Sequence, residues 1–292
     1  MQTKNIQYIF VAMTILLWSF VPTVAKLVLR NLNAFQVLNF TSFFAVLSLS
    51  FAVLFQKKVK SIKNYSRKQI LTMILIGVLS PFIYYVLLFE SFERAPVADA
   101  QILNYMWPIF VVIFATFILR QKLSIVKLTG IILSFFGAFI VVIKGQFSIF
   151  NPEYGIGYIM AILAAMIYGL FSVLGKKYDY ERFSSMLVYY ISTFVLVTLT
   201  VSLFSNFVIP SFWELLGLFY LGGIANSIGW VFWFKALQVG DIAKMSNLIY
   251  LVPFLSLIPV QFILNENIQI MSILGLLLIV TGILIQFKTH RK

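Results

Sequence analysis

The sequence predicts an all-α integral membrane protein with ten transmembrane helices, arranged as two inverted five-helix repeats. Three observations lead to this fold class: an apolar composition, ten membrane-length apolar stretches, and a similarity between the two halves of the chain. Of the 292 residues, 61% are hydrophobic and 11% are charged, whereas a soluble domain has about 45–50% apolar and about 25% charged residues. A water-soluble fold is therefore not expected.

The apolar stretches have the length of membrane-spanning helices, because about 20 residues cross a bilayer core about 30 Å thick. Runs such as 131–136 do not alternate apolar and polar residues, which argues against a β-barrel. The first stretch is longer than a signal-peptide core and has a counterpart later in the chain, so we expect it to be retained. The predicted spans are 6–28, 36–56, 70–89, 96–118, 123–144, 154–174, 184–206, 212–235, 241–264 and 269–287.

The lysines and arginines are distributed unevenly between the two ends of these spans. If both termini lie on one side of the membrane, that side carries 18 of the 22 basic residues. Basic residues concentrate in cytoplasmic loops, so we expect a multi-pass protein of the cell inner (cytoplasmic) membrane with both termini cytoplasmic. The net charge of +13 is then explained by topology and by anionic lipid on the cytoplasmic side, and no nucleic-acid partner is expected.

The residue types that most catalytic and metal sites require are missing. The chain has no cysteine, and its one histidine is His290 in the C-terminal tail. We therefore expect no enzyme, no catalytic residues, no metal and no cofactor. All carboxylates fall at span ends or in loops, which argues against a proton relay built on a buried acid.

The two halves of the chain align with each other at a nearly constant offset. A shift of 145 residues pairs Gly77 with Gly222 and Tyr105 with Tyr250, and a shift of 150 pairs Trp18 with Tyr168 in the earlier spans. Each half contains five spans, an odd number, so the halves enter the membrane from opposite faces. We expect a first repeat over 1–150 and a second over 151–292. Inverted repeats of this kind are typical of secondary transporters.

The fourth predicted span, its surroundings and their counterparts in the second half give a more specific pattern. Its residues are Ala95, Ala98, 103–108, Leu119, Leu123, Gly130 and Gly137, with Ala243, Tyr250, Pro253, 264–266, Gly275 and Gly282 in the second half. With this pattern the chain resembles the EamA family of the drug/metabolite transporter superfamily over essentially its whole length, and the Asn-Tyr-X-Trp-Pro stretch resembles YddG-type aromatic amino-acid exporters within that family. Gln121 departs from the family pattern, which usually has the glutamate that Glu266 keeps in the second half.

This resemblance implies two five-helix repeats that export amino acids or other small metabolites. It also implies a central cavity lined mainly by spans 1, 3, 4, 6, 8 and 9. It does not fix the substrate, because the family is chemically diverse.

Aromatic and amide side chains share helix faces in several of the predicted spans. Rings could wall a cavity for an apolar or aromatic substrate, and amides could bind its polar end. In the span 212–235, for example, Asn226, Trp230 and Trp233 share one face. The alternative is that these groups hydrogen-bond between helices or lie at the membrane interfaces, and the interface is the alternative for Trp213 and Trp233. The predicted substrate-binding residues are Trp18, Tyr84, Tyr85, Gln101, Asn104, Trp107, Tyr168, Asn226, Trp230, Ser246 and Tyr250.

Two mid-span prolines are paired by the repeat, Pro108 and Pro253. Proline removes a helical hydrogen bond and bends the helix, so we interpret both as hinges. The glycines Gly130, Gly137, Gly275 and Gly282 are spaced for close helix packing. Lys244, one turn into the ninth span, either meets a substrate carboxylate or extends to lipid headgroups.

These patterns predict a secondary transporter that moves small organic metabolites by alternating access, with export of aromatic or other apolar amino acids as the leading hypothesis. The alternative is an importer of an organic cation, a nucleobase-like compound or a cofactor on the same fold, since rings also bind cations. A structural scaffold would not require inverted repeats. The expected partners are a small-molecule substrate and the lipid bilayer, and the sequence is compatible with a monomer.

Overall fold

The computed structural model describes residues 5–95, 100, 103–122, 124–143, 152–204, 208–264 and 270–288, and its regular elements there are all helices. Among these described residues, seven helices are long and apolar enough to cross a membrane. Three shorter apolar helices, Trp107–Ile118, Ile125–Ile140 and Ile273–Ile285, lie where the remaining spans are predicted. The prediction of an all-helical, multi-span membrane protein is confirmed, while the count of ten spans stays a prediction.

The first half of the chain follows the predicted spans, with several of them interrupted. The first span divides into two helices, and the third contains a π-helical segment at its middle. The elements are α1 (Ile6–Ser19), α2 (Val21–Val28), α3 (Ala34–Phe55), α4 (Val59–Lys63), α5 (Arg67–Gly77), η1 (Val78–Ile83), α6 (Tyr84–Arg94), α8 (Trp107–Ile118) and α9 (Ile125–Ile143).

The second half repeats this order with its own interruptions. A π-helical segment again lies within the third span of the half, and the next span divides into three short helices. The elements are η2 (Pro152–Tyr154), α10 (Gly155–Lys177), α11 (Arg182–Phe204), α12 (Phe212–Phe219), η3 (Tyr220–Ala225), α13 (Ile228–Val239), α14 (Ile242–Leu248), α15 (Leu251–Leu255), α16 (Leu257–Leu264) and α17 (Ile270–Lys288).

The helices α5 and α12, which the repeat makes equivalent, begin with the same capping device. Ser66 Oγ accepts a hydrogen bond from Gln69 N at 3.2 Å, while Gln69 Oε1 accepts one from Ser66 N at 2.8 Å. Ser211 and Glu214 make the same reciprocal pair at the start of α12. Such a capping box satisfies two backbone donors that a helix start leaves free. Ser66 and Ser211 are 145 residues apart, the offset that the sequence predicts.

The predicted hinge prolines lie beside breaks in their spans. Pro108 is the second residue of α8, directly after a turn at Tyr105 and Met106. Pro253 lies within α15, which follows the break that ends α14. Both prolines therefore stand where the helix axis is interrupted, and their use as hinges stays a prediction.

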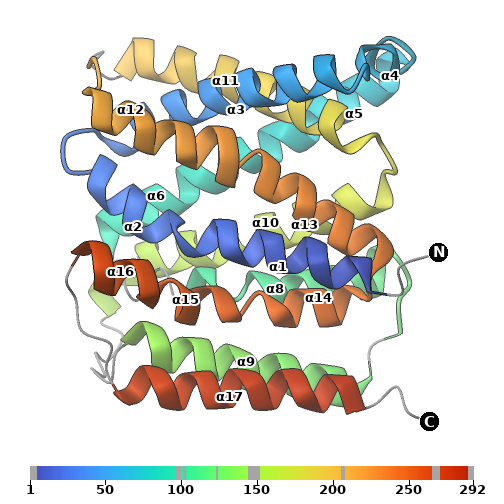
Figure 1. Cartoon of the computed structure of the whole chain (residues 1–292), viewed down its shortest axis with the longest axis vertical. Coiled ribbons are helices and arrows are strands. Elements are labelled where there is room, and N and C mark those ends of the chain that lie inside the picture. The colour runs from blue at the N-terminus through green and yellow to red at the C-terminus, as the bar shows by residue number, and fades with distance from the viewer. Residues whose placement is uncertain are drawn as a thin grey trace.

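Equivalent helices of the two halves pack against each other. Helix α9 packs against α17 and α3 against α11, while the α1–α13 contact has its counterpart in α10–α6. Figure 1 shows α9 and α17 side by side along one edge of the molecule. In this pair Gly137 approaches Gly275, and Gly282 approaches Gly130, so the helices run antiparallel and equivalent residues exchange partners. A two-fold axis across the helices, as inverted repeats require, produces this exchange.

The α9–α17 crossing yields a stability prediction. A Cβ atom on Gly137 would lie 2.6 Å from the carbonyl oxygen of Gly275 and 2.7 Å from the Ile279 nitrogen, and backbone atoms cannot move aside cheaply. We expect Gly137→Ala to destabilise the purified protein by about 1–3 kcal/mol, seen as a lower Tm. Gly155→Ala is the matched control, because nothing lies within 4 Å of its added Cβ. Equal melting temperatures of the two variants would contradict the close packing.

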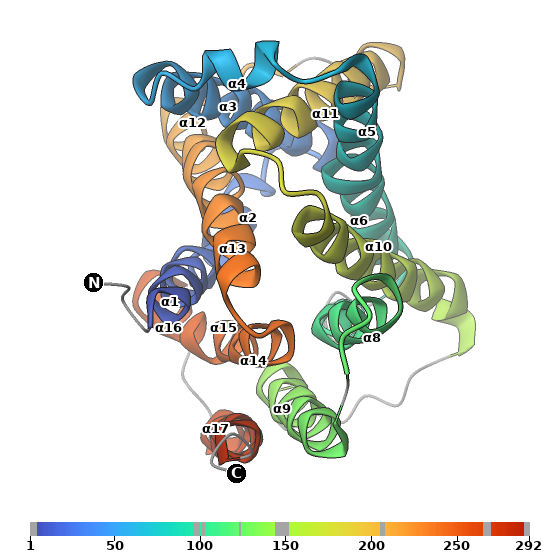
Figure 2. The ribbon, with the colours of Figure 1, turned by 90° about the vertical axis from the view of Figure 1, so that its right-hand side faces the viewer.

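The bundle has a central group of helices flanked by two outer pairs. Seen along the helices, α1, α6, α8, α10, α13 and α14 surround the middle, α3 and α11 lie at one side, and α9 and α17 lie at the other (Figure 2). Helix α1 begins and α17 ends at the same end of the bundle, where the lysine-bearing α4 also lies (Figure 1). Large apolar side chains such as Phe51, Phe55 and Phe204 are exposed on the outside, as expected for a surface in lipid.

Candidate substrate site and Arg182 polar network

A cluster of aromatic side chains fills the middle of the bundle, and we call it the aromatic core. Its rings come from helices of both halves: α1, α6 and α8 from the first, and α10 and α13 from the second. The rings contact one another at centroid distances between 4.6 and 6.3 Å. The aromatic core consists of Trp18, Tyr84, Tyr85, Trp107, Tyr168, Phe171, Trp230 and Trp233.

Tyr168 of α10 is the hub of the aromatic core. Its ring lies 4.6 Å from Trp107 and 5.0 Å from Tyr84, measured between ring centroids. Trp230 and Trp18 lie at 5.5 and 6.3 Å. Only 4% of Tyr168 is exposed. One side chain thus joins α10 to α1, α6, α8 and α13, because the rings of all four helices meet on it.

Hydrogen bonds fix several of these rings in place. Trp18 Nε1 donates to the carbonyl oxygen of Ala225 at 3.1 Å, and Trp233 Nε1 donates to Ser172 Oγ at 3.1 Å. Asn104 Nδ2 donates to Tyr84 Oη at 3.3 Å. A buried indole N–H normally finds an acceptor, and the N–H groups of Trp18 and Trp233 each have one.

Most of the predicted substrate-binding residues come together at this place. The six aromatic residues Trp18, Tyr84, Tyr85, Trp107, Tyr168 and Trp230 all belong to the aromatic core. The two predicted asparagines lie at its edge: Asn104 binds Tyr84, and the side chain of Asn226 hydrogen-bonds Tyr85. Gln101 lies outside the described residues.

Ser246 and Tyr250 are placed elsewhere. Tyr250 packs against Phe135 of α9 at a centroid distance of 6.3 Å and belongs to a separate cluster with Tyr105 and Ala243. On the same span, Met245 and Ile249 belong instead to the large hydrophobic cluster that contains Trp107, Tyr168 and Trp230. The buried hydroxyls of Ser246 and Tyr250 have no hydrogen-bond partner among the described residues. The structure therefore does not bring these two side chains onto the aromatic rings.

Two members of the aromatic core are not among the predicted substrate-binding residues. Trp233 shares a helix face with Trp230 in the sequence, with the membrane interface as its alternative; it is 1% exposed and its ring lies 5.3 Å from Trp107, so the interface alternative is wrong. Trp213, which has the same alternative, is 78% exposed. The other member, Phe171, lies 4.9 Å from Trp230. Helical spacing could have found Phe171, because it follows Tyr168 by three positions.

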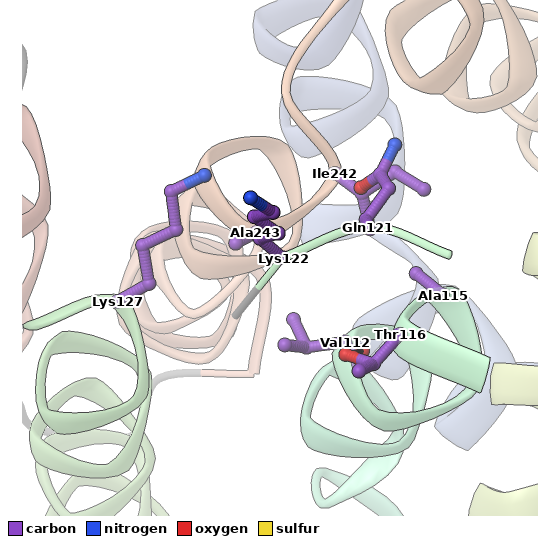
Figure 3. A pocket seen from close by; sticks show the side chains of 8 residues that line it. All are labelled: Val112, Ala115, Thr116, Gln121, Lys122, Lys127, Ile242 and Ala243. Carbon is purple, nitrogen blue, oxygen red and sulfur yellow. Dashed lines mark hydrogen bonds between the residues drawn. The ribbon is translucent and has the colours of Figure 1, made fainter. Parts of the chain in front are cut away.

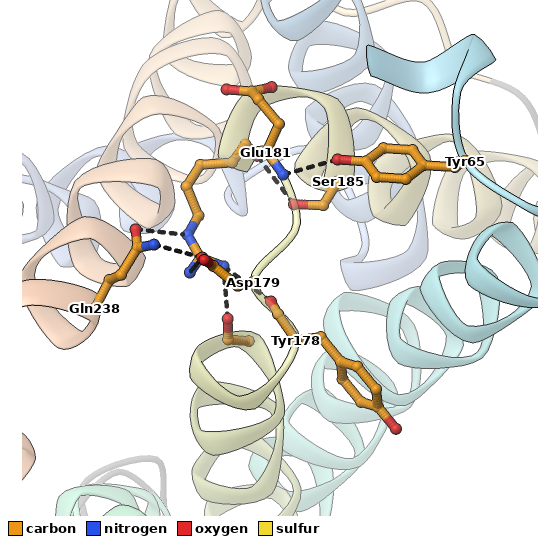
Figure 4. A network of polar contacts seen from close by, with 8 residues as sticks. Tyr65, Tyr178, Asp179, Glu181, Ser185 and Gln238 are labelled. Carbon is orange, nitrogen blue, oxygen red and sulfur yellow. Dashed lines mark hydrogen bonds and ion pairs between the residues drawn. The ribbon is translucent and has the colours of Figure 1, made fainter.

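A polar network closes one end of the bundle around Arg182, the first residue of α11 (Figure 4). The Arg182 guanidinium donates to the carbonyl oxygens of Gly175 at 2.6 Å and Tyr178 at 3.3 Å, both near the end of α10. It also donates to Gln238 of α13 at 3.4 Å, and Gln238 in turn binds Asp179. Arg182 is 5% exposed. It therefore ties α10, α11 and α13 together at the end where α1 begins.

Two ion pairs extend this network to neighbouring elements. Lys58 Nζ lies 2.6 Å from Glu181 Oε1, which links the end of α3 to the α10–α11 connection. Lys127 Nζ lies 2.5 Å from Asp241 Oδ2, which links α9 to the start of α14. Burial alone would raise the pKa of both carboxyls. Hydrogen bonds from Lys58 and Ser184 outweigh it at Glu181, and those from Lys127 and Lys244 outweigh it at Asp241, so each pKa lies below its ordinary value.

These lowered carboxyl pKa values give a pH prediction. A group whose pKa is lower in the folded state stabilises the fold above its unfolded pKa, and this contribution is lost as pH falls through the folded pKa. We expect the Tm of the purified protein to be flat from about pH 8 to about pH 5 and to fall only below about pH 4. A step in Tm near neutral pH would show that a group other than these two carboxyls controls the pH dependence of stability.

A small cavity of about 10 Å³ lies beside the Lys127–Asp241 pair. Figure 3 shows the side chains around it, which come from α8, from the α8–α9 connection, from the start of α9 and from the start of α14. A volume of this size holds about one water molecule, so it is too small for an organic substrate. Its lining residues are Val112, Ala115, Thr116, Gln121, Lys122, Lys127, Ile242 and Ala243.

The fold matches that of a protein of known structure. A solved crystal structure superposes with a TM-score of 0.87, covering 98% of this chain and 99% of that chain at 22% sequence identity. The likeness extends over the whole bundle and shows that its arrangement of helices is shared with that protein.

Sequence comparison finds transporters among the relatives. The chain is 28% identical over 187 residues to the aromatic amino acid exporter YddG of Ancylobacter novellus, covering 62% of this chain and 63% of that protein. It is 26% identical over 264 residues to an S-adenosylmethionine uptake transporter of Rickettsia prowazekii, covering 90% of this chain and 85% of that protein. The model of the EamA-like transporter family matches residues 5–143 and again 155–287. The chain belongs to the EamA-like transporter family, within the drug/metabolite transporter superfamily, and is a multi-pass membrane protein whose relatives carry metabolites.

Proposed function

We propose that this protein is a secondary transporter of the cytoplasmic membrane that exports aromatic or other apolar amino acids by alternating access. The observation that carries the proposal is the aromatic core, which lies where helices of both halves meet. Substrate sites of transporters built from repeats lie at such a meeting point. The relative named as an aromatic amino acid exporter supports the substrate class.

The chemistry of the aromatic core suits an apolar or aromatic side chain. Its rings offer faces and edges for stacking, each good ring contact contributing about 0.5–1.5 kcal/mol beyond burial. Asn104 and Asn226 at its edge supply neutral donors and acceptors for the polar end of a substrate. The rings pack against one another in this structure, so substrate entry requires the helices that carry them to move apart.

The two halves supply the moving parts in this proposal. We propose that residues 1–150 and 151–292 are the two inverted repeats, that they rock against each other about the aromatic core, and that Pro108 and Pro253 act as hinges. The paired helix contacts support this division, because α1–α13 and α10–α6 are equivalent contacts. The end that carries α4 and the Arg182 network is proposed to face the cytoplasm, since the predicted basic loops lie there.

An importer is the second candidate function. A ring cluster also suits an organic cation, and the relative named as an S-adenosylmethionine uptake transporter favours this alternative. Both candidates use the same aromatic core and differ in substrate and direction.

A flux assay in proteoliposomes separates these candidates. The purified protein would be tested for counterflow of a panel of amino acids and organic cations, with and without a pH gradient. We expect exchange of phenylalanine, tyrosine or tryptophan that does not depend on pH. Movement of a sulfonium or quaternary amine without any amino-acid exchange would replace the export proposal with the import one.

A further inference from the structure

Two lysines and two phenylalanines form a basic, ring-lined crevice near the end of the bundle where α1 begins. Lys235 Nζ lies 5.5 Å from the ring centroid of Phe10 on α1 and 5.2 Å from that of Phe183 on α11. Lys58 Nζ lies 4.8 Å from the same Phe183 ring. Both ammonium groups therefore lie close to one ring, although they come from different parts of the chain.

This crevice carries more positive than negative charge. The carboxylate that interacts with both lysines is Glu181, and it is bound by Lys58 at 2.6 Å and by the Ser184 backbone N–H at 2.8 Å. Within the described residues the Lys235 ammonium forms no ion pair or hydrogen bond, and it lies over the two rings. Two half-buried lysines thus share one carboxylate, which leaves an excess of one positive charge.

Lys235 faces outward from α13 and not toward the aromatic core. The residues of α13 that pack inside are Trp230, Trp233, Phe234 and Leu237, while Phe232 and Lys235 share the half-buried face. Phe232 stacks on Phe10 at 6.1 Å. The crevice therefore opens to the surroundings of the bundle beside α1, and it is separate from the proposed substrate site.

The depth and surroundings of the crevice fit a lipid headgroup. Lys235 is four residues from the end of α13, about 6 Å along the helix axis, and Lys58 directly precedes α4 at the same end of the bundle. Highly exposed apolar side chains lie near two members of this group in the chain: Leu54 and Phe55 at the end of α3 shortly precede Lys58, and Ile9 precedes Phe10 on α1. Lysines beside exposed apolar side chains match the phosphate and the acyl chains of a phospholipid.

We propose that Lys235 and Lys58, with the rings of Phe10 and Phe183, bind the phosphate of one anionic phospholipid of the cytoplasmic leaflet. Basic pockets between membrane helices on the cytoplasmic side bind such headgroups. The lipid phosphate supplies the counter-charge for this excess positive charge, and its acyl chains cover the exposed residues of α1 and α3. The inference rests on the proposed cytoplasmic placement of this end and is independent of the transported substrate.

Native mass spectrometry of the purified protein with phosphatidylglycerol and phosphatidylcholine tests this site. We expect wild-type protein to retain one phosphatidylglycerol in preference to phosphatidylcholine, and Lys235→Gln to retain it about fivefold less, which corresponds to about 1 kcal/mol. Lys60→Gln and Lys63→Gln are matched controls, because these exposed lysines carry the same charge on α4. Both controls should retain the lipid as wild type does.

Two outcomes would overturn the proposal. Equal loss of lipid in Lys235→Gln and in the α4 controls would mean that general leaflet charge, and not a site, holds the lipid. A thermal shift with inorganic phosphate as large as that with phosphatidylglycerol, lost in Lys235→Gln, would assign the crevice to a free anion. Neither readout uses transport, so a failed flux assay leaves this test unaffected.

Discussion

Replacing Tyr168 by alanine is expected to abolish transport and to lower the stability of the bundle. The ring joins α10 to rings of α1, α6, α8 and α13, so its removal leaves a cavity where five helices meet. Truncating a buried aromatic side chain typically costs about 3–5 kcal/mol. Loss of even about 1.4 kcal/mol of substrate contact lowers affinity about tenfold, so both Tm and flux should fall.

Two further variants separate the loss of the Tyr168 ring from the loss of its hydroxyl group and from the loss of a tyrosine ring outside the aromatic core. Tyr168→Phe keeps the ring and should retain fold and most of the flux. Tyr154→Ala removes a tyrosine ring from η2 that contacts Tyr158 and is 37% exposed, and it should leave both measurements near wild type. Wild-type flux in Tyr168→Ala would show that the substrate does not pass through the aromatic core.

Replacing Arg182 by methionine is expected to give the largest loss of stability at the end of the bundle where α1 begins. The guanidinium satisfies the carbonyl oxygens of Gly175 and Tyr178 and the side chain of Gln238 in a site where it is 5% exposed. Removing one member of a buried charged network leaves its partners without hydrogen bonds and typically costs about 3–5 kcal/mol. We expect a marked fall in Tm, and freer access to the bundle from this end.

A surface pair gives the matched control for Arg182. Arg94 and Glu90 form an i,i+4 ion pair with N–O distance 3.0 Å, and the Arg94 side chain is 51% exposed. Such pairs contribute about 0–1 kcal/mol, so Arg94→Met should change Tm little. Arg182→Lys keeps the charge but not the planar fork of donors, and it should restore only part of the stability. A wild-type Tm for Arg182→Met would exclude the network as a tie between α10, α11 and α13.

The sequence predicts the fold class because the bilayer imposes long apolar helices whose positions hydropathy reveals. The breaks inside the spans are harder to predict. In the ninth span the helix ends at Leu248 and restarts at Leu251, which divides a side-chain stripe that looks continuous in the sequence. Tyr250 packs against Phe135 of α9, in the same cluster as Tyr105, its counterpart in the other half.

The candidate site could be predicted in part for a similar reason. Trp18 and Tyr168 are equivalent positions of the predicted repeat, and their rings lie 6.3 Å apart. For Trp233 the sequence leaves both the cavity and the interface open, because a tryptophan near a span end suits either place. Only the packing of α13 on α10 shows that it is buried. The role of Arg182 depends on how the α10–α11 connection folds back on α10, which residue types in a short loop do not reveal.

The central claim is that the aromatic core is a solute chamber that opens in turn to each side of the membrane. Thiol labelling tests it most directly, because the chain contains no cysteine of its own. Ser172 is fully buried and its Oγ accepts a hydrogen bond from Trp233, so Ser172→Cys places one thiol at the rings. A membrane-impermeant thiol reagent would be applied to either face of sealed vesicles. We expect modification from both faces, slowed by a transported substrate. Modification from one face alone, or at a rate that a transported substrate does not change, would contradict a shared chamber between the two halves.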